Sequence, residues 1–170
     1  MAKAPHRPGE RFARLAASVR EERDRLARVV QEAAGALEQL SSSHSPSTLE
    51  LRGLGDVLHD FYTGAERIFA KIAPELNGGV PAGLSWHHEL LDNMTLELPG
   101  IRPAVIRREA ARALEEFLRF RHLFRNVYGF ELEWPRLRAL ARRVPKAWRL
   151  LNADIKRFVS FLDAAARAED

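Results

Sequence analysis

The sequence contains no cysteine, which excludes disulfide bonds and metal sites built on thiolates. The absence of cysteine also fits a reducing compartment, and we expect a cytoplasmic protein. No run of apolar residues is long enough to span a bilayer. The opening residues, MAKAPHR, are followed by no apolar core of the kind that a secretory signal needs. The sequence therefore predicts a protein without a membrane partner.

The sequence also lacks the alternation of apolar and polar residues that is typical of strands, and it contains no internal repeat. Hydrophobic residues nevertheless make up 46% of the 170 residues, which is enough for a real core. They recur at helical spacing, in steps of three and four. We therefore predict an all-α fold, an up-and-down helical bundle with short connections, formed by one domain over residues 1–170.

A long N-terminal helix is expected over residues 10–40, ahead of a core bundle over residues 48–168. The apolar row of the N-terminal helix has one polar member, Glu22. Ser47 and Glu50 have the spacing of a capping box, which starts the second helix. Within that second helix a lone Gly-x-Gly occurs, but no strand precedes it, which excludes a nucleotide-binding loop.

Serine and proline residues mark the expected ends of the later helices. Ser85 is suited to cap a short third helix, and Pro103 suits the first position of the fourth. Pro135 suits the start of a fifth helix, which Pro145 should break because proline removes a backbone hydrogen bond. These expected helices cover residues 86–96, 103–128, a stretch from 135 and a last stretch over 146–167.

Positive charge is concentrated in the C-terminal part of the chain. The sequence pI is near 9.9, and residues 101–170 carry a net charge of +7 against −3 for residues 1–100. Nine basic residues lie between positions 119 and 149, opposed by two glutamates. Arginines grouped in this way commonly bind phosphates, although a solvated helix face is the common alternative. The nine are Arg119, Arg121, Arg125, Arg136, Arg138, Arg142, Arg143, Lys146 and Arg149.

The stretch from Arg119 to Gly129, RFRHLFRNVYG, combines this charge with aromatic and amide side chains. On a helix with about 100° per residue, an apolar face would form, with Arg121, Arg125 and Tyr128 along its edge. A partly buried edge of arginines suits an anion, because charge there is screened less than on open surface. Gly129 would then end the helix.

The order of residues in this stretch resembles a known motif. The spacing of Arg121, Asn126 and Tyr128, with four residues between the first two and one between the last two, resembles the arginine-x4-histidine-x-tyrosine motif of HEPN-type ribonucleases. The resemblance is closest to the HepT-like toxins of bacterial toxin–antitoxin pairs. The flanking FRHLFR, YG and ELEW segments resemble the same proteins. The resemblance covers residues 48–160 and departs from the motif at one place, where Asn126 replaces the histidine.

The resemblance implies a helical HEPN-like bundle and the toxin of a type VII-like toxin–antitoxin module, a metal-independent endoribonuclease without a cofactor. It places Arg121 and Asn126 at the catalytic positions and implies that Tyr128 accepts AMP from a nucleotidyltransferase antitoxin of the MNT type. Arg119, Arg125 and His122 are the expected RNA-binding residues. The implied partners are RNA, the nucleotidyltransferase and a second copy of the chain in a homodimer.

Asn126 cannot shuttle a proton as histidine does. The chain as written is therefore expected to be inactive, either as a natural homologue or as an inactivated form, unless it uses another base. His122 is a nearby alternative, although it lies about 100° round the helix from Arg121. The alternative function is a non-catalytic helical adaptor or dimer that binds a nucleotidyltransferase partner or RNA.

Two smaller alternatives concern single residues. Tyr128 could instead be a half-buried tyrosine that anchors the helix end. His88 and Asp92, four residues apart, lack a third metal ligand, and no metal site is expected.

Overall fold

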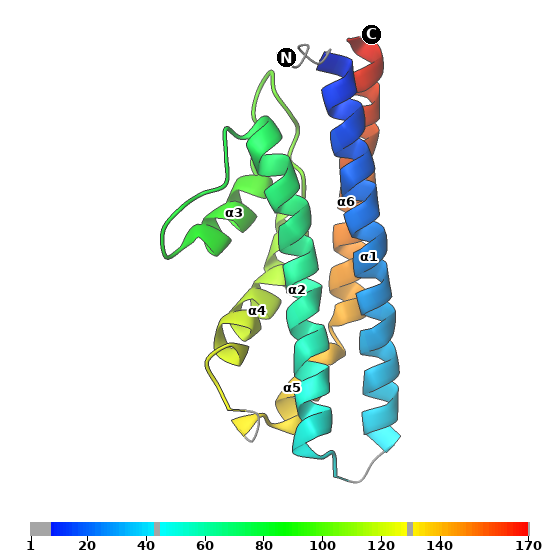
Figure 1. Ribbon diagram of the computed structural model, residues 1–170, viewed down its shortest axis with the longest axis vertical. Coiled ribbons are helices and arrows are strands. Elements are labelled where there is room, and N and C mark those ends of the chain that lie inside the picture. The colour runs from blue at the N-terminus through cyan, green and yellow to red at the C-terminus, as the bar shows by residue number, and fades with distance from the viewer. Residues whose placement is uncertain (1–7, 43–44, 129–130, 170) are drawn as a thin grey trace, which may run out of the picture.

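The computed structural model describes residues 8–42, 45–128 and 131–169. These residues form helices connected by loops, with one isolated bridge between Leu98 and Arg102 and no named strand among them. The predicted all-α class is confirmed (Figure 1). The helices are α1 (Pro8–Ser42), α2 (Thr48–Leu76), α3 (Trp86–Met94), α4 (Arg108–Phe124), α5 (Trp134–Ala141) and α6 (Val144–Ala168).

Three long helices form the body of the bundle. α1 packs against α2 and α6, and α4 packs against α2 and α6 as well. In Figure 1, α3 and α4 lie on the side of α2 that faces away from α1. No helix in the described part of the chain is long and apolar enough to cross a membrane.

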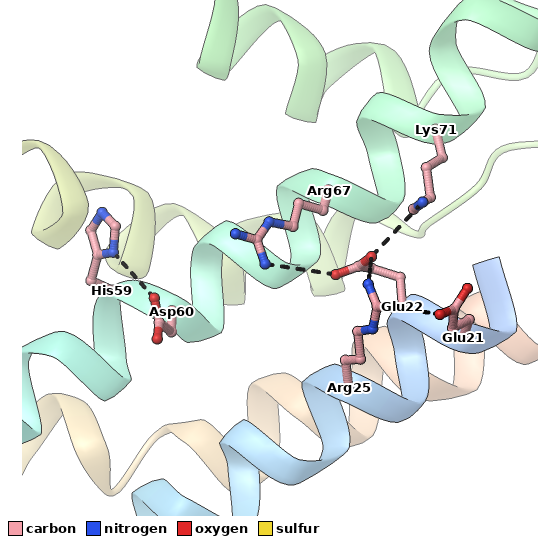
Figure 2. A network of polar contacts seen from close by, with 7 residues as sticks. All are labelled: Glu21, Glu22, Arg25, His59, Asp60, Arg67 and Lys71. Carbon is pink, nitrogen blue, oxygen red and sulfur yellow. Dashed lines mark hydrogen bonds and ion pairs between the residues drawn. The ribbon is translucent and has the colours of Figure 1, made fainter. Parts of the chain in front are cut away.

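α1 agrees with the helix predicted over 10–40 and explains its one polar member. Glu22 is only 3% exposed, and a buried carboxylate requires compensating charge. Three cations supply it: Arg25 Nη1 lies 3.5 Å from the Glu22 carboxylate, and Arg67 Nη1 and Lys71 Nζ lie 3.9 Å from it. Figure 2 shows Arg67 and Lys71 reaching from α2 towards Glu22 on α1, so this cluster joins the two helices.

The start of α2 confirms the predicted capping box. The backbone N–H of Ser47 donates to Glu50 Oε2 at 2.7 Å, and the backbone N–H of Glu50 donates to Ser47 Oγ at 3.3 Å. The Gly-x-Gly of α2 has a packing role at its second glycine. A Cβ atom at Gly55 would lie 2.4 Å from Cε2 of Phe124, so the glycine lets the end of α4 approach α2.

α4 begins five residues later than predicted, at Arg108 instead of Pro103. The preceding chain has another partner, because the backbone N–H groups of Val105 and Ile106 both donate to the carbonyl of Met94 at 2.9 and 3.1 Å. The side chains of Val105 and Ile106 are fully buried. Tertiary contacts with the end of α3 therefore outweigh the local preference of proline for the first helical position.

A carboxylate from another helix caps the start of α4. Asp154 on α6 is fully buried and accepts hydrogen bonds from the backbone N–H and the Nε of Arg107 at 2.8 and 2.7 Å. Arg157 Nη1 donates to the same carboxylate at 3.0 Å. A negative charge at a helix N-terminus is stabilising, so Asp154 fixes the place where α4 starts.

The remaining helix ends agree with the predictions in part. α3 ends at Met94 instead of residue 96, and Ser85 makes no capping hydrogen bond to the backbone. Its hydroxyl donates instead to Glu89 Oε1 at 2.5 Å. Pro135 and Pro145 each lie in the first turn of a helix, α5 and α6, and the predicted break between these helices is confirmed.

Candidate functional site

The end of α4 divides the motif into two parts. The helix ends at Phe124, so the prediction of one helix through residue 128 is wrong. The backbone forms a tighter turn there, because the N–H of Asn126 donates to the carbonyl of Leu123, three residues back, at 3.0 Å. Arg121 lies on the helix, whereas Asn126 and Tyr128 lie beyond it and do not continue its stripe. Gly129, the predicted stop, is outside the described residues.

Arg121 is buried more deeply than the predicted edge position, with its side chain 9% exposed. Its guanidinium contacts two other helices. Nη1 lies 3.1 Å from Nε2 of His87 on α3, and Nη2 lies 3.5 Å from Oε1 of Glu66 on α2. Its Nε is buried without a hydrogen-bond partner among the described residues. The motif arginine therefore joins α2, α3 and α4 at one point.

The contacts of His87 determine which of its ring nitrogens carries the proton. A guanidinium can only donate hydrogen bonds, so the His87 Nε2 that faces Arg121 must accept. The proton then lies on Nδ1, which is 2.5 Å from Oε2 of Glu66 and donates to it. Glu66, His87 and Arg121, which we call the buried trio, thus form a chain of carboxylate, neutral imidazole and guanidinium. Its charges compensate each other, as buried charges must.

Tyr62 lies on the same buried face of α2 and shares this electrostatic environment. Burial raises the pKa of its phenol, and the negative charges of Glu66 and Asp92 raise it further, while Arg121 opposes them. The phenol therefore stays protonated at physiological pH. Tyr62 contributes a neutral, fully buried wall beside the buried trio.

His122 reaches the same place from the next position of α4. Its half-buried ring lies 5.3 Å from the ring of His87 and 5.8 Å from that of His88, the last pair being parallel within 3°. Partial burial lowers the pKa of His122 below its usual value, and the positive charge of Arg121 lowers it further, against an opposing effect of Glu66. His122 is therefore neutral at neutral pH. His122 lies about 100° round α4 from Arg121, but both side chains contact the ring of His87. The two residues therefore share one environment.

The second part of the motif is exposed. Asn126 Nδ2 donates to the backbone carbonyl of His122 at 2.8 Å, so its carboxamide caps the last turn of α4. The Tyr128 side chain is 69% exposed, in contrast to the half-buried anchor considered as an alternative. Its backbone N–H donates to Glu131 Oε2 at 2.7 Å. The structure therefore places Arg121 inside the bundle and Asn126 and Tyr128 on its surface.

Two further predicted residues lie apart from the buried trio. Arg119 and Arg125 are both exposed, and Arg119 makes a loose ion pair with Glu115 at 3.5 Å. Arg119 also borders a groove of about 410 Å³ between α4 and α5. The groove is lined by apolar and charged side chains, which include Phe120, Leu123, Val127, Leu132, Glu133 and Arg136.

Sequence reasoning missed Glu66 and His87 as partners of Arg121. Glu66 follows Tyr62 by four residues and therefore lies on the same buried stripe of α2. A charged residue on that stripe was the signal that could have indicated a buried partner. His87 was visible only as part of a histidine-rich helix start. The described residues hold no group of three or more histidine, cysteine, aspartate or glutamate side chains able to bind a metal ion.

Most of the chain matches a known protein family. A family model described as HepT-like protein matches residues 53–162, which include nearly all of α2, the whole of α3 to α5 and most of α6. This range agrees with the resemblance over residues 48–160 and contains both the buried trio and the motif. Comparison with curated proteins and with solved structures gave no match.

Proposed function

The chain belongs to the HepT-like family, and on that premise we propose that it is a HepT-type component of a type VII-like toxin–antitoxin module. In this proposal it has the scaffold of a HEPN ribonuclease, binds RNA, and lacks the proton-transfer group of the motif. One observation carries the last point: the carboxamide of Asn126 donates to the His122 carbonyl at 2.8 Å and caps α4.

The chemistry of RNA cleavage explains why position 126 matters. Without a metal, a base must take the proton of the ribose 2′-hydroxyl, and a cation must stabilise the charge that develops on the phosphate. Imidazole can perform the first step near neutral pH, whereas a carboxamide has no useful proton affinity there. The cation is present in Arg121, so the motif retains one of its two chemical groups.

The distribution of charge supports RNA binding. Of the nine basic residues between positions 119 and 149, seven are exposed, including Arg119 and Arg125. Arg121 already has Glu66 and His87 as partners, so we assign the first contacts with phosphate to Arg119 and Arg125. Exposed arginines that neutralise phosphates give binding that weakens steeply as salt concentration rises.

The surface position of Tyr128 favours a second candidate function, that of an adaptor for a nucleotidyltransferase. Tyr128 is 69% exposed and follows Val127, which lines the groove between α4 and α5. An exposed phenol can accept AMP from a partner enzyme, and the apolar groove beside it would suit a partner or a second copy of the chain. The adaptor function requires no proton transfer at position 126.

Substitution of Asn126 by histidine separates the two functions. If the scaffold is that of a ribonuclease, Asn126→His should raise cleavage of a single-stranded RNA in EDTA and make the chain toxic when expressed, while Asn126→Gln should change neither. Arg121→Gln in the Asn126→His background should abolish the gain, with folding checked by circular dichroism. No detectable cleavage by a folded, RNA-binding Asn126→His variant would leave the adaptor as the function of this chain.

RNA binding has its own test. Arg119→Gln and Arg125→Gln should each weaken binding to the same RNA and reduce its salt dependence. Arg11→Gln is the matched control, because Arg11 is also exposed but pairs with Glu75 on the remote part of α1 and α2. Equal effects at all three positions would show that the region around the motif is not the RNA-binding surface.

A further inference from the structure

We propose that His122 and His88 form an acid–base pair that acts on the phosphodiester backbone of RNA, independently of position 126. The inference rests on the RNA binding proposed above and adds a reactive site to it. The two imidazoles come from different helices, His122 from α4 and His88 from α3. They lie at the surface, directly beside the buried trio.

The geometry of the two rings suits a phosphate group placed at their edges. The ring centroids are 5.8 Å apart and the planes are parallel within 3°, so the two imidazoles are close enough to contact one phosphate group. Each nitrogen can form a hydrogen bond of about 2.8 Å, which allows two oxygens of one phosphodiester to be contacted together. His88 is exposed and His122 is half-buried, so this edge is open to a ligand.

The buried trio fixes the position and the charge of His122. The ring of His122 meets that of His87 edge-on, at 74° and 5.3 Å, and His87 is itself held by Glu66 and Arg121. Arg121 thereby provides a constant positive charge behind the two imidazoles. This charge disfavours a proton on His122, and within the buried trio Glu66 compensates it.

The groups that face His122 assign it the task of the base. They are His87 and His88 from α3, Arg121 from α4 and Glu66 from α2. Partial burial and the charge of Arg121 lower the pKa of His122, and Glu66 opposes them. His122 is therefore unprotonated at neutral pH and ready to accept a proton. His88, whose ring is the more exposed of the two, is assigned the task of the acid, which supplies a proton.

The reaction balances without metal, water or an oxidant. His122 takes the proton of a ribose 2′-hydroxyl, and the 2′-oxygen forms a bond to phosphorus. The bond between phosphorus and the 5′-oxygen breaks, and that oxygen takes a proton from protonated His88. The products are a 2′,3′-cyclic phosphate and a 5′-hydroxyl end. The two histidines then exchange protons with solvent and return to their starting states.

The experiment uses the full chain and a short, end-labelled, single-stranded RNA of mixed sequence in EDTA. His122→Asn and His88→Asn should each slow cleavage at least about 100-fold, the lower end of the range for loss of an acid or base. His59→Asn is the matched control, since His59 is a half-buried histidine on α2 that pairs with Asp60, and its rate should stay within about twofold. Loss of His122 should remove the acidic limb of the pH profile, and loss of His88 the alkaline limb.

RNA affinity, measured by fluorescence anisotropy, distinguishes the ways in which the idea can fail. RNA that is bound by the wild-type chain but not cleaved, or is cleaved equally by all four proteins, overturns the acid–base pair and leaves RNA binding in place. No binding overturns both proposals. As a test that does not depend on the folding of the variants, a dinucleotide with 2′-deoxyribose should shift the imidazole NMR signals of His88 and His122 in the wild-type chain. Shifts confined to other residues would also overturn the pair.

Discussion

Removal of the negative charge from the buried trio should strongly destabilise the fold. Glu66→Gln keeps the size of the side chain and an acceptor for His87 Nδ1, but it leaves the guanidinium of Arg121 without its carboxylate. Both side chains are 9% exposed, so little water is available to replace the lost charge. Loss of one partner of a buried ion pair costs about 3–5 kcal/mol. For a chain of this size, a loss of about 3 kcal/mol lowers Tm by roughly 6–12 °C.

Equilibrium urea unfolding followed by circular dichroism measures this loss, with Glu115→Gln as the matched control. Glu115 pairs with Arg119 at 3.5 Å on the exposed face of α4, and such pairs contribute about 0–1 kcal/mol. The double variant Glu66→Gln/Arg121→Gln should lose less than the sum of its single changes, because it buries no uncompensated charge. If Glu66→Gln is no more destabilising than Glu115→Gln, the buried trio does not hold α2, α3 and α4 together.

Two further predictions use the same unfolding measurement. Gly55→Ala should destabilise the chain by about 1–3 kcal/mol because its Cβ would meet Phe124. Gly53 has open space around it, so Gly53→Ala should stabilise the chain by about 0.4–1 kcal/mol. Changes of the same sign for both variants would contradict the packing role of Gly55. The lowered pKa of His122 in the folded chain means that the unfolded chain binds more protons below pH about 6.5, so stability should be lost as the pH falls from 7.5 to 5. His122→Asn should reduce that pH dependence, and an identical dependence in both proteins would show that His122 is not the group responsible.

The parts of the fold that could be predicted depend on neighbours in the sequence. The apolar row of α1, the capping box of Ser47 and Glu50, and the prolines at the starts of α5 and α6 act within one or two helical turns. Such signals are complete in the sequence, because every atom that takes part lies a few residues away. The all-α class and the order of the helices follow from them.

The start of α4 could not be predicted because distant residues determine it. Its start depends on the Met94 carbonyl and on the buried carboxylate of Asp154, which is 47 residues from Arg107. A local rule placed the start at Pro103, where proline is acceptable but the chain has better partners elsewhere. The same reason explains the missed partners of Arg121, since His87 is 34 residues away. A helical wheel gives the direction of a side chain, but it does not give the residues of other helices that the side chain contacts.

The end of α4 separates Arg121 from Asn126, and this separation predicts different effects for substitutions at the two positions. Arg121 contacts Glu66 and His87, so its loss would leave a buried carboxylate without its charge partner and loosen three helices. Asn126 bonds to a carbonyl of its own last turn and is exposed, so substitution there leaves the buried trio intact. A substitution at position 126 should therefore be tolerated by the fold, whereas a substitution at Arg121 should destabilise it. Stability alone is then a sufficient reason for an arginine at position 121, and the proposed function has to be tested at position 126 and at the neighbouring histidines.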